Sequence, residues 1–133
     1  PDLEGLFLRN LNLLDFMAPS VWKNLVIYTG GDAVVRAFDI HRGTLAWEKE
    51  FKSPISSAPL VAGDRLYFGL LGDPHADDPK ERTPSLVCIS ARDGRFLFRL
   101  EVEGAILSAP VVAGKWLMFG TDKSLFYILE EVF

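Results

Sequence analysis

The feature that most constrains the fold of this chain is a repeat within its own sequence. Residues Ser57–Gly63 read SAPLVAG, and Ser108–Gly114 read SAPVVAG, 51 positions later. An earlier copy begins at Ala18-Pro19, 40 positions before Pro59. Recurrence at such a spacing is typical of chains that use one structural unit several times, so we expect three related units in succession.

Each copy predicts four short antiparallel strands. Apolar and β-branched residues gather in short runs that suit a pleated, half-buried surface, and clusters such as Gly30–Asp32 and His41–Gly43 mark turns between the runs. A four-stranded unit of about 40 residues is typical of a β-propeller blade, so the predicted fold class is all-β. In the first copy the predicted strands are Pro19–Trp22, Leu25–Thr29, Val34–Asp39 and Leu45–Phe51.

The second and third copies fit the same frame with different lengths. The second copy carries a polar insertion of eleven residues between Gly72 and Pro84, which accounts for its longer spacing. In the third copy Leu125–Leu129 takes the place of a third strand, and little chain follows. We therefore divide most of the chain into a blade at 18–57, a blade at 58–108 with a rim insertion at 72–84, and a partial blade at 109–133.

The first residues fit either of two structures. The repeat register places Gly5–Leu11 as an outer strand, so that residues 1–17 belong to a preceding blade. A helix is the alternative, because one helical face would hold Leu3, Phe7, Leu11 and Leu14, but the register favours the strand. The chain then holds three blades' worth of strands, part of a ring of about six to eight blades. An ordinary β-sandwich is the alternative, which the threefold recurrence disfavours.

Composition excludes several classes of protein. With 14 basic and 18 acidic residues the net charge is −4, and no basic stripe is available for nucleic acid. The single cysteine, Cys88, excludes an intrachain disulfide, and one Cys with two His is too few for a structural zinc site. No apolar run of about 18 residues predicts a transmembrane segment. Because the sequence starts at Pro1, we expect a processed or excised chain.

A motif spans the third and fourth predicted strands of the first copy. It reads Ala37-x-Asp39-x-x-x-Gly43-Thr44-x-x-Trp47. A glycine permits positive φ in a tight turn, and the small Ala37 leaves room for a neighbouring sheet. The Asp39 carboxylate can accept hydrogen bonds from turn amides. Trp47 offers a large flat surface for burial between sheets. These are structural roles.

This motif resembles the tryptophan-docking repeat of the quinoprotein, or PQQ-like, propeller family, whose pattern is A-x-D-x-x-x-G-K-x-x-W. Thr44 stands where lysine is usual. The second copy is degenerate: it keeps the glycine as Gly94 and an aromatic residue as Phe98, with Cys88 and Ser90 in place of Ala and Asp. Together with the S-A-P openings, the resemblance covers nearly the whole chain.

The resemblance implies one of two branches. Quinone-dependent dehydrogenases of the family bind pyrroloquinoline quinone and a metal through a set of Asp, Glu and Asn residues, and often carry a vicinal Cys pair. The other branch lacks the cofactor and works by binding; it includes a lipoprotein of the bacterial outer-membrane β-barrel assembly machine. This chain has no Cys-Cys pair and no motif for that ligand set, so it resembles the second branch.

The resemblance therefore implies a non-catalytic protein-binding or scaffold module of the periplasm or cell envelope, with no cofactor. Its partners would be a protein or further blades, from the same chain or from a second copy in a homo-oligomer. One alternative is a fragment of a PQQ-dependent dehydrogenase whose catalytic residues lie outside this chain. A structural subunit segment of a large assembly is the other.

The insertion gathers most of the polar side chains that could form a site. A hard cation is one candidate ligand, although the loop lacks the Gly and Glu positions of an EF-hand. Partner binding is the other, because loops at a rim commonly carry recognition; a solvated loop stiffened by prolines is the plain alternative. The metal candidates are Asp73, His75, Asp77 and Asp78, and the partner-binding candidates add Lys80 and Arg82.

No residue is predicted to be catalytic. The sequence contains no G-x-S-x-G, no H-E-x-x-H and no P-loop. His41 is expected to be a surface turn histidine, because no nucleophile or orienting acid accompanies it. Cys88, between Val87 and Ile89, is expected to be a buried, inert thiol.

Overall fold

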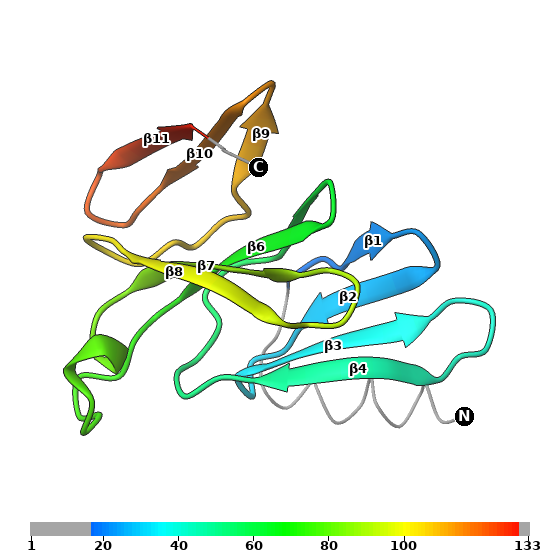
Figure 1. The fold of residues 1–133 in the computed structure, drawn as a ribbon. Helices are drawn as coiled ribbons and strands as arrows, with labels where there is room; N and C mark the ends of the chain where they lie inside the picture. Colours follow the sequence, from blue (N-terminus) through cyan, green and yellow to red (C-terminus); the bar gives the residue numbers. More distant parts are fainter. Residues whose placement is uncertain (1–16, 131–133) are drawn as a thin grey trace.

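The chain folds into a row of small antiparallel sheets. A computed structural model describes residues 17–130, which form eleven strands and one short 3-10 helix (Figure 1). The first sheet contains β1 Ser20–Trp22, β2 Leu25–Thr29, β3 Val34–Asp39 and β4 Leu45–Glu50. The second contains β5 Leu60–Ala62, β6 Arg65–Leu70, β7 Ser85–Ser90 and β8 Phe96–Glu101. The third contains β9 Val111–Ala113, β10 Trp116–Gly120 and β11 Phe126–Glu130, and the 3-10 helix η1 is Pro79–Glu81.

Each sheet is a simple meander in which every strand pairs with the next one along the chain. The predicted all-β class and the repeated antiparallel units are confirmed, and each predicted strand that falls within residues 17–130 lies within one residue of an observed one. The strand expected over Gly5–Leu11 and its helical alternative over residues 3–14 lie outside the described residues. In the part that the structure describes, the third sheet has three strands where the others have four.

The first two sheets bury a shared core. On β2 and β3, Ile27, Val35 and Ala37 are fully buried, and they cluster with Phe68 of β6 and Ile89 of β7. Their neighbours along the strands are less buried, as the alternation of side chains in a half-covered sheet requires.

The second and third sheets bury another core on the opposite face of the middle sheet. Tyr67, Leu86 and Cys88 cluster with Leu117 and Phe119 of β10. The middle sheet is therefore covered on both sides, and β6 and β7 are buried along almost their whole length. This explains why both strands read as nearly continuous apolar runs instead of alternating ones.

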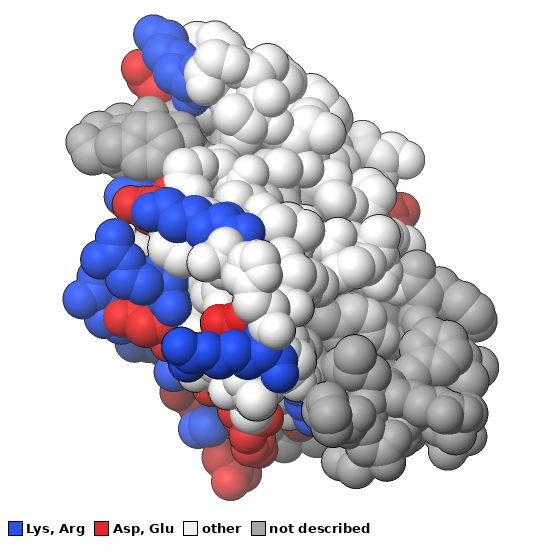
Figure 2. All heavy atoms as spheres, turned by 90° about the vertical axis from the view of Figure 1, so that its right-hand side faces the viewer, with Lys and Arg blue, Asp and Glu red and all other residues white. Residues whose placement is uncertain are grey.

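Charge is distributed unevenly across each sheet. The first strands of the three sheets, SVW, LVA and VVA, contain no charged residue. The fourth strands, LAWEKE and FLFRLE, carry their charged residues in the second half, and charge on an edge strand discourages pairing with other chains. Figure 2 shows this uneven distribution: charged side chains gather toward one side of that view, and a broad area without them lies beside it.

Candidate functional site

Trp47 of β4 contacts the second sheet at the turn between β7 and β8. Its indole Nε1 donates a hydrogen bond to the backbone oxygen of Ala91 at 3.2 Å. The ring lies over Gly94, where an added Cβ would be 2.5 Å from Cε3 of the indole. Gly94 has φ +76°, a conformation that side chains disfavour. The glycine therefore serves both the turn and the close approach of the ring.

The turn between β3 and β4 is held by Asp39. Its carboxylate accepts hydrogen bonds from the backbone N–H groups of His41 at 2.9 Å and Arg42 at 3.0 Å. The Arg42 N–H, followed by that of His41, lowers the pKa of Asp39. Gly43 closes the turn at φ +66°. Exposed His41 thus lies in a surface turn, with its N–H used by the motif aspartate.

Phe98 takes the tryptophan position in the second sheet and has less cover. It pairs across the ladder with Cys88, whose side chain belongs to the core shared with the third sheet. The ring remains 37% exposed and makes an edge contact with Tyr67, with the ring centroids 6.2 Å apart. Trp47 contacts the turn after the third strand of the next sheet, but within residues 17–130 no corresponding turn follows β11 to contact Phe98.

The insertion between β6 and β7 is organised by its own polar groups. The Asp73 carboxylate accepts from the N–H of His75 at 2.9 Å, and that of Asp78 accepts from Lys80 N–H at 3.0 Å. The Arg82 guanidinium donates to two backbone carbonyls of the loop, at 2.8 and 3.2 Å. Within residues 17–130, no group of three or more His, Cys, Asp or Glu side chains is placed to hold a metal ion.

An ion pair that the sequence did not single out fastens the insertion to the second sheet. Arg99 of β8 contacts Glu81 of η1 at 2.8 Å and donates to the backbone oxygen of Thr83 at 3.3 Å. The two partners are 18 positions apart: Arg99 stands between Phe98 and Leu100, and Glu81 stands between Lys80 and Arg82 in the insertion. Nothing in the local pattern distinguishes this pair from other surface charges.

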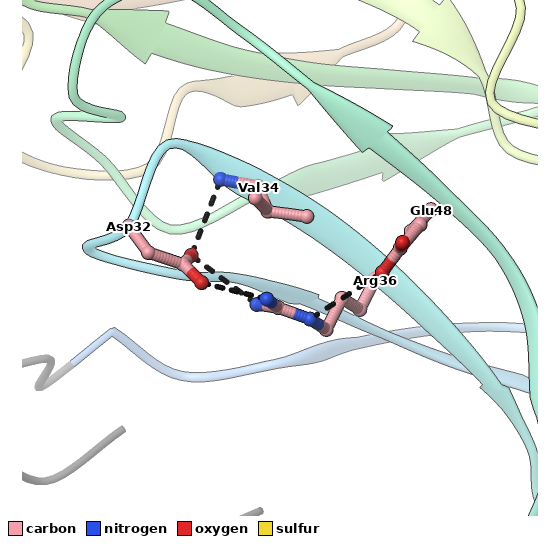
Figure 3. A network of polar contacts seen from close by, with 4 residues as sticks. All are labelled: Asp32, Val34, Arg36 and Glu48. Atoms are coloured by element: carbon pink, nitrogen blue, oxygen red, sulfur yellow. Dashed lines mark hydrogen bonds and ion pairs between the residues drawn. The ribbon is translucent and has the colours of Figure 1, made fainter. Parts of the chain in front are cut away.

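A polar network fixes the β2–β3 hairpin of the first sheet (Figure 3). Arg36 forms a bidentate contact with Asp32, the shorter distance being 2.6 Å, and lies 3.7 Å from Glu48 of β4. Partial burial raises the pKa of Asp32, but the hydrogen bond and charge of Arg36 outweigh it and leave the pKa lowered. Arg36 thus links the hairpin turn to β4.

The third sheet presents an apolar face to solvent, on the side away from the core that it shares with the second sheet. Val111, Met118 and Ile128 are cross-strand neighbours in one row on this face. Trp116 and Phe126 lie on the same face of β10 and β11, and Phe126 is 65% exposed. We call these five residues the open face. The sequence alone does not distinguish this face, because nearly continuous apolar runs such as WLMFG and FYILE are also expected of strands buried on both sides.

Within residues 17–130, no helix has the length and apolarity needed to cross a membrane.

Comparison with solved structures shows the propeller arrangement. BamB from Moraxella catarrhalis superposes with a TM-score of 0.69 at 15% identity, over 86% of this chain and 32% of that one. The computationally designed Ika4 protein has a TM-score of 0.66 at 13% identity, over 86% of this chain and 65% of that one. The quinohemoprotein alcohol dehydrogenase ADHIIG from Pseudomonas putida HK5 has a TM-score of 0.64 at 16% identity, over 80% of this chain and 21% of that one.

This chain therefore spans about a third of the length of the BamB structure. A search of the curated proteins gave no match. A family model described as outer membrane protein assembly factor BamB matches residues 16–73 and 31–131. These segments cover most of the chain, and its three stacked sheets have the predicted repeat organisation. The chain belongs to this BamB-like family of PQQ-like β-propeller repeat proteins.

Proposed function

We propose that this chain is a non-catalytic propeller segment that binds protein and acts as a scaffold module in the cell envelope. Its family membership supports the propeller module, and the name of the matched family supports the envelope location. Its blades are the units 18–57, 58–108 and 109–133, with Trp47 and Gly94 as docking residues between the first two.

The open face is the observation that carries this proposal. It consists of the same residue types that fill the two cores between the sheets, yet Phe126, Ile128 and Val111 are 65%, 58% and 54% exposed. Contiguous apolar surface of this kind marks a protein interaction site. The partner is a protein or a further blade, and a second copy of the chain is one source of such a blade.

Site-specific photocrosslinking tests the proposal. A benzoylphenylalanine at position 126 places the probe on the open face, and the same probe at position 42 provides a control in an exposed turn of the first sheet. We expect mass spectrometry to identify a discrete protein crosslinked from position 126 in an envelope extract, or a second copy of the chain, and nothing comparable from position 42. Equal labelling from both positions, or none from position 126, would contradict the proposal.

A second candidate is a fragment of a PQQ-dependent dehydrogenase with catalytic residues outside this chain. The similarity to the alcohol dehydrogenase ADHIIG favours it. The described residues do not fit the quinone and its metal, because the first strands of the three sheets carry no charged side chain and no group of three acidic, His or Cys ligands is present in residues 17–130. Stoichiometric co-elution of pyrroloquinoline quinone and Ca²⁺ with the chain would favour this candidate over ours.

A further inference from the structure

A groove lies between the fourth strands of the first two sheets, β4 and β8. It has a volume of about 200 Å³ and is lined by residues from the end of β4, from β8 and from the insertion. Trp47 lies two positions before Lys49, which lines the groove. The blade contact therefore holds both walls in place, and a preformed groove binds a ligand at low entropic cost.

The floor of the groove is apolar. Leu70 and Val87 are buried there, and Phe51 packs edge-on against Phe68 with the ring centroids 5.3 Å apart. Phe96 of β8 lines the same groove and is 46% exposed. The space and the lining match one large apolar side chain, which would cover the exposed ring.

The rim of the groove is locally positive on an acidic chain. Lys49 and Lys52 line it and form no ion pair within residues 17–130, whereas Arg99 is already neutralised by Glu81. Glu50 is the other carboxylate in the lining, so three cations face two carboxylates. The net charge of the whole chain is −4. The rim is therefore electrostatically complementary to a ligand that carries carboxylates.

We propose that this groove binds an acidic segment of a partner protein. One large apolar side chain of the segment lies on the floor formed by Phe51, Leu70 and Val87, and its flanking carboxylates contact Lys49 and Lys52. The inference rests on the proposed function as a protein-binding module, and it adds a second surface, separate from the open face, together with the chemistry of what binds there.

Fluorescence polarisation with synthetic peptides tests this proposal on the full 133-residue chain. The probe is a short fluorescein-labelled peptide in which one phenylalanine is flanked by aspartates and glutamates. Two matched peptides replace the phenylalanine by serine or the acidic residues by lysines. We expect saturable binding of the first peptide, binding at least about tenfold weaker for each matched peptide, and weaker binding at high salt.

Charge reversal on the protein locates the binding site. Lys49→Glu with Lys52→Glu should weaken binding about tenfold or more, and Phe96→Ser should weaken it without changing the charge. The control is Lys23→Glu with Lys123→Glu, which makes the same change of charge in turns of the first and third sheets. Circular dichroism checks that each variant is folded.

Absence of saturable binding below about 1 mM, or equal loss of affinity in the control variant, would overturn the groove proposal. Neither result would contradict the proposed function, because the crosslinking from position 126 tests that function on the open face alone. Conversely, peptide binding that depends on Lys49 and Lys52 would stand even if the open face captured nothing.

Discussion

Replacing Gly94 by alanine tests whether Trp47 fastens the first blade to the second. The glycine has φ +76°, and a Cβ built there lies 2.5 Å from Cε3 and 2.8 Å from Cζ3 of the indole. Both distances are shorter than any ordinary contact between carbon atoms. The ring is packed between two sheets and also bonded to Ala91, so alanine must displace it.

The expected cost has two parts. Positive φ costs an alanine about 1 kcal/mol, and overpacking against the ring adds about 1–3 kcal/mol. We therefore expect Gly94→Ala to lower the free energy of unfolding by about 2–4 kcal/mol. Gly63 and Gly114 provide matched controls, since their φ values are +61° and +60° and nothing lies within 4 Å of an added Cβ. Alanine at either position should cost only about 1 kcal/mol.

A double-mutant cycle with Trp47→Ala isolates the contact. Urea unfolding followed by circular dichroism measures all four proteins, because fluorescence would change with the loss of the tryptophan. Trp47→Ala alone should cost about 3 kcal/mol, and in that background Gly94→Ala should cost only about 1 kcal/mol. A cost for Gly94→Ala equal to that of Gly63→Ala, or equal costs in both backgrounds, would refute the docking argument.

The remaining predictions concern the insertion and the hairpin network. Arg82→Ala removes the guanidinium that bonds the carbonyls of Ala76 and Asp77, so hydrogen exchange should accelerate throughout the insertion while the melting temperature stays nearly unchanged; unchanged exchange would contradict this. Asp32 has a pKa lowered by Arg36 in the folded chain. As the pH falls, Asp32 is therefore protonated at a higher pH in the unfolded chain than in the folded one. Its contribution to stability is complete above about pH 4 and is lost as the pH falls through the folded pKa. The free energy of unfolding should therefore fall less steeply below about pH 4 in Asp32→Asn than in the wild type. The same slope in both proteins would contradict the assignment.

The sequence predicted the strands well because the physical cause of each strand is local. Short apolar runs ended by clusters such as Gly30–Asp32 predicted β2 and β3 to the residue, and the spacing between repeats added the blade as a unit. The small Ala37 predicted the close approach of a neighbouring sheet, and Gly43 predicted a tight turn with positive φ.

The contacts between sheets could not be predicted in the same way. Trp47 was expected to be buried, but its position over Gly94, 47 positions further on, depends on how two sheets twist against each other. The groove has the same origin, since Lys49 of β4 and Phe96 of β8 line it together only when the two sheets are packed. Arg82 and the acidic residues of the insertion were chosen as ligand candidates because composition does not reveal which groups the loop uses for its own hydrogen bonds.

Light scattering after size exclusion tests the central claim, that the open face is an interaction surface. The chain has a mass of 14.8 kDa. We predict that its apparent mass rises above this value with concentration, and that Phe126→Lys with Ile128→Lys abolishes the rise. The matched control Leu45→Lys, at an exposed site on β4, should leave the rise intact. A wild-type chain that stays folded and monomeric at 14.8 kDa at every concentration, and that also crosslinks to no other protein from position 126, would contradict the claim.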